Sequence, residues 1–152
     1  MKERHYVEVE LSSHELKECF ELLSYRVMDE KREHDAKPIV EAVIKLKGPN
    51  GNEVHTAELG NGPVNALDRA LRKALNTFYP NGLEHVELVD FRVRAVNAES
   101  QKGTSAKVEV EILTTDGNYY WKTFGRGEDV IEASWQALAA SFAYKLMQER
   151  AT

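Results

Sequence analysis

Residues 60–68, Gly-Asn-Gly-Pro-Val-Asn-Ala-Leu-Asp, lie where a strand-like pattern ends and a helical pattern begins. Gly60 and Gly62 let the backbone turn tightly, and Pro63 is suited to the first turn of a helix. The first N–H groups of such a helix have no partner within the helix, so they bind anions such as carboxylate or phosphate. The stretch therefore predicts a tight loop and a helix start that is a candidate anion site.

Alternating and helical patterns surround this loop. Val40–Lys47 alternates apolar and polar residues, and the breaker residues that follow it predict a hairpin turn. After Pro63 the apolar residues recur at helical spacing. The expected elements are a first strand within 15–28 (Phe20 to Val27), a strand at 40–47, a turn at 48–52, a strand at 53–59 and a helix from 63 to 78.

The second half of the chain repeats this order. Gly125-Arg126-Gly127 is expected to be equivalent to Gly60-Asn61-Gly62, since each glycine pair lies between a third strand and a helix. The expected elements are strands at 86–96, 107–113 and 119–124, a loop at 125–129 and a broadly apolar helix from 130 to 146. In the first of these strands Val89, Phe91, Val93 and Ala95 are expected to share a face. The sequence thus predicts an α+β fold of two βββα units, each an antiparallel three-stranded sheet with one helix.

Composition narrows the possible functions. With 152 residues, 42% of them hydrophobic, the chain can bury one good core. Its net charge of −5 argues against nucleic acid as a partner. Cys19 is the single cysteine and the five histidines have no metal-ligand spacing, so no metal site or cofactor is expected. No apolar run reaches membrane-spanning length, and a cytoplasmic protein that does not bind membranes is expected.

Two stretches together resemble a known family. Residues 60–71 look like the first signature of the C-terminal regulatory domain of 2-isopropylmalate synthase and citramalate synthase, and residues 130–138 look like the second. Three further segments fall in the matching order between them: Asp90–Arg94, Gly103–Ala106 and Trp121–Thr123. Phe78-Tyr79-Pro80 and Trp135 are closer to the citramalate synthase branch. The resemblance covers about 20–147, so residues 1–19 are interpreted as an N-terminal extension or linker and 20–152 as the regulatory domain.

The resemblance implies a fold and a role. The two βββα units would pack together and dimerise with a second chain. The domain would bind an end-product amino acid, isoleucine or leucine, and inhibit a separate catalytic barrel, in cis or in trans. That barrel carries the divalent metal and the two substrate sites in the family, so catalysis by this chain alone is not expected.

The family's effector pocket maps onto this sequence position by position. A zwitterionic amino acid needs N–H donors for its carboxylate, acceptors for its ammonium and a small apolar pocket for its side chain. The N–H groups after Pro63 or Gly127 would supply the donors, and Asp129 or loop carbonyls the acceptors. The effector-binding residues that the resemblance implies are Gly60, Gly62, Val64, Ala66, Leu67, Phe91, Ala95, Thr104, Ala106, Asp129 and Val130.

Several of these residues have a structural alternative. Phe91 and Val64 are also typical of ordinary core, and Asp129 is a good helix N-cap. Thr104 is equally a turn residue. Trp121 and Trp135 are interpreted as packing residues.

The chain also departs from the citramalate synthase pattern. In the second loop, Glu128-Asp129 replaces a small hydroxyl residue and an asparagine, and Phe91 stands where tyrosine is commoner. Because the acidic pair would compete with a ligand carboxylate, the Gly60 loop is the predicted carboxylate end.

Three functions follow from these observations. The leading one is an amino-acid-sensing regulatory and dimerisation domain. The second is a structural dimerisation module without an effector. The third is a phosphate- or nucleotide-binding module that uses the Gly60 loop, although this loop lacks the third glycine of a dinucleotide fingerprint and the Lys-Ser/Thr pair of a P-loop. The amino acid that binds and the catalytic partner stay open at this point.

Overall fold

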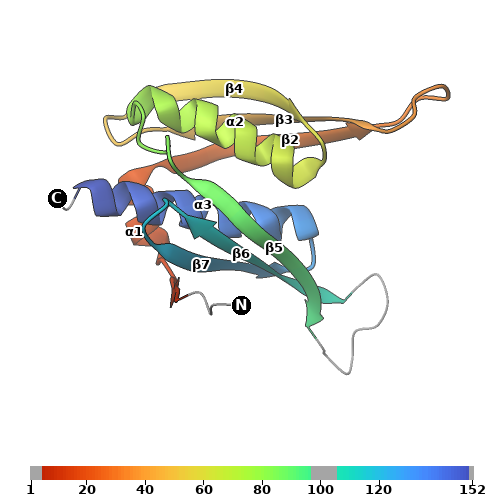
Figure 1. The fold of residues 1–152 in the computed structure, drawn as a ribbon. Coiled ribbons are helices and arrows are strands. Elements are labelled where there is room, and N and C mark those ends of the chain that lie inside the picture. The colour runs from red at the N-terminus through yellow and green to blue at the C-terminus, as the bar shows by residue number, and fades with distance from the viewer. Residues whose placement is uncertain (1–4, 97–105, 151–152) are drawn as a thin grey trace. The chain divides into compact units, whose positions relative to one another are not determined.

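The computed structural model describes residues 5–96 and 106–150 (Figure 1). It confirms the predicted α+β fold with two βββα units. The elements in chain order are β1 (Val7–Glu8), α1 (Ser13–Cys19), β2 (Glu21–Glu30), β3 (Ile39–Lys47), β4 (Glu53–Gly60), α2 (Pro63–Phe78), β5 (Glu87–Val96), β6 (Lys107–Thr115), β7 (Tyr120–Gly127) and α3 (Val130–Arg150).

The chain divides into two compact units. Unit 2 is Ser13–Leu83, and it holds α1, the β2-β3-β4 sheet and α2. Unit 1 combines the residues up to Ser12 with those from Glu84 onward, and it holds the β1-β7-β6-β5 sheet and α3. Unit 1 is therefore built from two stretches of sequence, with unit 2 inserted between them.

In unit 2, α2 packs against β3 and β4. The alternation predicted for residues 40–47 is confirmed, because the residues of β3 that face α2 are buried and those between them are not. The apolar stripe of α2 supplies the other half of the core, as its helical spacing predicted. The buried residues of β3 and α2 are Val40, Ala42, Ile44, Leu46, Ala66, Leu67, Ala70, Leu71, Ala74 and Leu75.

In unit 1, α3 packs against β7 and β6. Buried residues from Ala133 to Leu146 lie on more than one side of α3, which confirms the expectation from its broad apolar pattern. Trp121 is buried and its Nε1–H donates to the carbonyl of Ser141 at 3.0 Å, so the interpretation of Trp121 as a packing residue is confirmed. Short β1 pairs in parallel with the outer edge of β7.

The two units are related by a shift of 67 residues, which differs from the predicted alignment of the loops. The strands before the helices end at Gly60 and Gly127, and the helices begin at Pro63 and Val130. Gly60 is therefore equivalent to Gly127, and Gly62 to Asp129. The expected match of Gly60 with Gly125 was wrong, because β7 continues three residues beyond Phe124 and Gly125 lies within the strand.

Two further expectations need correction. Residues 15–19 precede the first strand as a helix, since Leu16, Cys19 and Phe20 have helical spacing and Phe20 N–H donates to the Leu16 carbonyl at 3.0 Å. A β-bulge at Val89 removes this residue from the strand face that it was expected to share with Phe91, Val93 and Ala95. Leu88 joins the face of Phe91 in its place, because they pair with Thr114 and Ile112 respectively.

Residues 1–19, interpreted as an extension or linker, contain defined structure. β1 belongs to the sheet of unit 1, and α1 ends at the buried Cys19. The carbonyl of Cys19 accepts a hydrogen bond from the Tyr79 hydroxyl at 2.6 Å, which joins the end of α1 to the end of α2.

Candidate functional site

The junction between β4 and α2 has the geometry that the sequence predicted. Gly62 is the N-cap residue of α2 and Pro63 its first helical residue. A Cβ on Gly60 would collide with the backbone of Ala66, so the glycine lets the strand end lie directly against the first turn of the helix. Among the described residues, no side chain caps this helix start. The N–H groups of its first turn therefore remain available to an acceptor.

The corresponding start of α3 is capped by a side chain of this chain, that of Asp129. One carboxylate oxygen of Asp129, Oδ1, accepts hydrogen bonds from Ile131 N–H at 2.8 Å and Glu132 N–H at 3.2 Å. This is the capping role that the sequence offered as the alternative for Asp129. The two helix starts thus differ chemically, since only the α3 start already holds a carboxylate.

The other predicted residues of unit 2 have different accessibilities. Val64 is half-buried in the first turn of α2. Ala66 and Leu67 are completely buried, so their side chains belong to the core of the unit. Of the predicted residues in unit 2, Gly60, Gly62 and Val64 are therefore the ones within reach of a ligand.

The predicted residues of unit 1 lie on β5, before β6 and at the start of α3. Phe91 and Ala95 lie on the sheet face that carries Ile112 and Val108, the face on which α3 packs. Because α3 covers β7 and β6, Phe91 stays 39% exposed on this face. Ala106 is half-buried just before β6, and Val130 is exposed. Thr104 lies outside the described residues.

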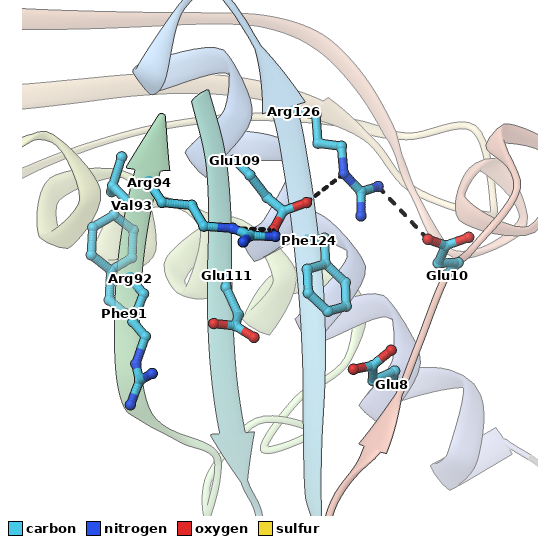
Figure 2. Close-up of a pocket in the computed structure, with 10 residues that line it drawn as sticks. All are labelled: Glu8, Glu10, Phe91, Arg92, Val93, Arg94, Glu109, Glu111, Phe124 and Arg126. Carbon is cyan, nitrogen blue, oxygen red and sulfur yellow. Dashed lines mark hydrogen bonds and ion pairs between the residues drawn. The ribbon is translucent and has the colours of Figure 1, made fainter. Parts of the chain in front are cut away.

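The opposite face of the unit 1 sheet carries a charge network that the sequence analysis did not identify (Figure 2). Glu109 accepts from Arg94 Nη2 at 2.7 Å and from Arg126 Nε at 2.7 Å, and its own side chain is only 9% exposed. Hydrogen bonds from Arg94 and then Arg126 hold the pKa of Glu109 below its usual range. The network borders a hollow of about 840 Å³ that also includes Glu10, which lies 3.7 Å from Arg126.

The sequence pattern indicates one part of this network, the strand face on which Glu109 lies. The alternation of residues 107–113 places Glu109 on the polar face of its strand, with Lys107 and Glu111. The cation partners come from neighbouring strands, because Arg94 and Arg126 both pair with Glu109 in the sheet register. The register, which depends on where the chain turns, was needed to bring the three side chains together.

A second charged cluster joins α3 to the turn between β6 and β7. Lys145 on α3 donates to Asp116 at 2.8 Å and to Glu149 at 2.8 Å. Burial acts to raise the pKa of Asp116, but hydrogen bonds from Lys145, Tyr119 N–H and Asn118 N–H together lower it to about 2. This cluster borders a hollow of about 630 Å³ lined largely by aromatic side chains, including Tyr6, Tyr119, Tyr120 and Tyr144.

Metal-binding clusters and membrane-spanning helices are both absent from the described parts of the chain. In residues 5–96 and 106–150, no group of three or more His, Cys, Asp or Glu side chains is placed to hold a metal ion. No helix within the same residues combines the length and the apolar character needed to cross a membrane.

Known proteins match this chain along most of its length. The family model described as the LeuA allosteric (dimerisation) domain matches residues 4–146. The chain is 52% identical over 134 residues to a protein named (R)-citramalate synthase from Aquifex aeolicus, covering 88% of this chain and 25% of that protein. It is 48% identical over 127 residues to (R)-citramalate synthase from Geobacter sulfurreducens, covering 84% of this chain and 23% of that protein.

The similarity extends to a second named activity. A 2-isopropylmalate synthase from Dictyoglomus turgidum is 39% identical over 100 residues, which are 63% of this chain and 17% of that protein. The chain spans about a quarter of the length of the citramalate synthases that it matches.

Proposed function

The chain belongs to the LeuA allosteric (dimerisation) domain family, and from this premise we propose that it binds a branched-chain amino acid, isoleucine or leucine, as a feedback effector. In this proposal the chain forms a homodimer and inhibits the catalytic barrel of a citramalate or 2-isopropylmalate synthase when the effector binds. The names of its relatives support the synthase assignment, and the family description supports both regulation and dimerisation.

The observation that carries the proposal is the difference between the two helix starts. At α2 the first-turn N–H groups follow Gly62, which has no side chain to cap them. At α3 the same positions are occupied by the carboxylate of Asp129. An amino-acid carboxylate placed at the α2 start would make the hydrogen bonds that Asp129 makes at α3, and it would also benefit from the helix dipole.

The remaining parts of the effector need other groups. The ammonium requires carbonyl or carboxylate acceptors, which the loop at Gly60–Gly62 offers through its backbone carbonyls. The branched side chain requires a small apolar wall, to which the half-buried Val64 contributes. Phe91, Ala95, Thr104, Ala106, Asp129 and Val130 stay predicted effector-binding residues of unit 1.

Calorimetric titration with isoleucine, leucine and valine tests the sensing part of the proposal. One methylene in an apolar pocket is worth about 1–3 kcal/mol, so valine, which has one methylene fewer than isoleucine or leucine, should bind about tenfold or more weakly than the preferred amino acid. Isoleucine or leucine should bind at micromolar to millimolar concentration, and valine should bind more weakly. If none of the three produces heat or a thermal shift at millimolar concentration, effector binding is refuted.

Sedimentation tests the dimerisation part separately. A dimer at micromolar concentration that binds no amino acid would identify a structural dimerisation module. Inorganic phosphate and ATP, titrated in the same way, test the use of the Gly60 loop for phosphate compounds. Heat with phosphate compounds and none with amino acids would favour that function over sensing.

A further inference from the structure

The outer faces of the two sheets, which point away from α2 and α3, can be compared position by position. In β3 the residues that face α2 are buried and alternate with the others, so Glu41 lies on the outer face. Glu41 is the third residue of β3, as Glu109 is the third residue of β6. Each glutamate lies opposite the eighth residue of the first strand and the seventh residue of the third strand of its sheet. The two glutamates are therefore equivalent.

Each glutamate has four nearest neighbours on its face, two on the adjacent strands and two on its own strand. Around Glu109 all four are charged: Arg94, Arg126, Lys107 and Glu111 (Figure 2). Around Glu41 all four are apolar: Met28, Leu59, Ile39 and Val43. Three of these apolar side chains are about half exposed, namely Met28, Ile39 and Leu59. The outer face of unit 2 therefore carries an exposed apolar ring where unit 1 carries its charge network, and such a patch is typical of an interaction surface.

The carboxylate inside this ring differs from that of Glu109 in its pairing. Glu109 accepts from two guanidinium groups. Glu41 makes no hydrogen bond or ion pair with any residue that the structure describes. Within the same described residues, Arg26, the diagonal neighbour of Glu41 on β2, also lacks an ionic partner. A surface that covers the ring must supply a cation to Glu41, because burial of an unpaired carboxylate is destabilising.

Arg26 and Glu41 belong to a group of four residues with a simple symmetry. On the outer face Arg26 lies opposite Val43. Two residues further along β2, Met28 lies opposite Glu41. The charged residues therefore occupy one diagonal of the group and the apolar residues the other. A twofold axis that runs over the Met28–Val43 diagonal, between two stacked copies, exchanges the positions of Arg26 and Glu41. Each Arg26 then lies over the partner's Glu41, so the face is complementary to itself.

The packing that this axis requires is one that sheets adopt. Strands lie about 4.8 Å apart, and residues of one face follow each other at about 6.8 Å along a strand. An axis over the diagonal therefore makes an angle of roughly 45° with the strands. The strands of the two copies would cross at roughly 90°, which is the orthogonal class of sheet packing.

We propose that the outer face of unit 2 is an interface between two copies of this chain. Met28 and Val43 meet their counterparts at its centre, and reciprocal ion pairs between Arg26 and the partner's Glu41 flank that centre. A second copy fits this face because the face itself carries the cation that Glu41 needs. The interface rests on the proposed association of two copies, for which it names a surface, and it does not depend on amino-acid binding at the start of α2.

Sedimentation equilibrium of the full chain, which measures the strength of self-association, tests this interface. Glu41→Arg should weaken self-association by about tenfold or more, because two arginines would face each other across the axis. Arg26→Glu should weaken it similarly, because two glutamates would face each other. The chain with both substitutions restores the pairs with exchanged signs and should associate within about threefold of wild type. Lys47→Glu, an exposed charge reversal on the same face six residues after Glu41, is the control and should have no effect.

Mixing the two single variants separates a lost interface from a misfolded chain. In a mixed dimer, each arginine of the Glu41→Arg chain meets a glutamate of the Arg26→Glu chain. The mixture should therefore associate although each variant alone does not. A wild-type chain that is monomeric at about 100 μM would refute both this interface and the proposed homodimer. Single variants that associate as strongly as wild type, or a mixture that fails to associate, would refute this interface and leave the homodimer to another surface.

Discussion

Thr56 and Thr123 make the same hydrogen bond in the two units. Each is buried on the third strand of its sheet and donates its hydroxyl at 2.8 Å to a helix carbonyl fourteen residues later, that of Ala70 or Ala137. The pair fixes the register between strand and helix twice in the chain, 67 residues apart. The internal repeat that the order of elements predicted is therefore visible in side-chain contacts as well as in topology.

Replacing either threonine by valine should destabilise its unit. Valine keeps the shape of the side chain but removes the donor, and a lost buried hydrogen bond costs about 1 kcal/mol. Urea unfolding followed by circular dichroism should show a decrease of this size for both Thr56→Val and Thr123→Val. Thr77→Val, at an exposed position of α2, is the control and should change the free energy of unfolding by less than about 0.5 kcal/mol. Equal values for all three variants would contradict the structural role of the pair.

The glycines of the first loop should respond differently to alanine. A Cβ on Gly60 would meet the backbone of Ala66, so Gly60→Ala should lower the free energy of unfolding by about 1–3 kcal/mol. A Cβ on Gly62 has no atom within 4 Å, and the backbone there is extended, so Gly62→Ala should cost less than about 0.5 kcal/mol. Thermal unfolding of the two variants measures the difference. A Gly60→Ala protein as stable as wild type would show that the close approach is not required.

The features that the sequence predicted well depend on local patterns. The alternation of 40–47 and the helical spacing after Pro63 are each contained in one stretch, and both elements were found with nearly the expected bounds. The tight junction at Gly60 also follows from residues that are neighbours in the chain.

The features that the sequence did not predict depend on distant pairing. β1 exists only as a partner of β7, in which Trp121 lies opposite Val7 although the two residues are more than a hundred positions apart in the sequence. Glu109 meets Arg94 and Arg126 only once three strands are in register. The equivalence of Gly62 with Asp129 was missed because the G-x-G pattern of residues 125–127 resembles that of residues 60–62, although β7 continues through it. Local sequence patterns therefore predict the helices and strands, whereas the side-chain contacts between strands depend on the register in which the strands pair.

Protonation of the Asp116 carboxylate should lower the free energy of unfolding in acid. Its folded pKa is about 2, below the ordinary value of 3.8, so its contribution is complete above pH 3.8 and is lost as the pH falls through 2. The difference corresponds to about 2 kcal/mol. Asn in place of Asp116 keeps an oxygen for the turn N–H groups of Asn118 and Tyr119 but loses the ion pair with Lys145.

Unfolding measured at several pH values between about 4 and 2 tests this assignment. Asp116→Asn should be less stable than wild type at neutral pH, and the gap should close toward pH 2. Lys145→Met should reduce the same acid dependence, because it removes the cation while leaving the carboxyl buried. A wild-type protein whose free energy of unfolding is constant across this range would contradict the ion pair's contribution.

Gly62 and Asp129 occupy equivalent positions, and exchanging their chemistry tests the proposed carboxylate site. Gly62→Asp should cap α2 as Asp129 caps α3, because its Cβ has open space and the backbone is already extended. The cap and the helix dipole should raise the free energy of unfolding by about 0.3–1 kcal/mol. The new carboxylate would occupy the N–H groups and repel the ligand, so the affinity for isoleucine or leucine should fall by about tenfold or more.

Calorimetry and urea unfolding on the same samples separate these two effects. Gly62→Ala is the matched control, since it adds a Cβ without a carboxylate and should leave the affinity within about threefold of wild type. A more stable Gly62→Asp protein that no longer binds the amino acid would place the effector carboxylate at the start of α2. A Gly62→Asp protein that binds isoleucine or leucine as tightly as wild type would exclude this helix start as the carboxylate site, because a ligand carboxylate and the introduced aspartate side chain cannot accept the same two N–H groups.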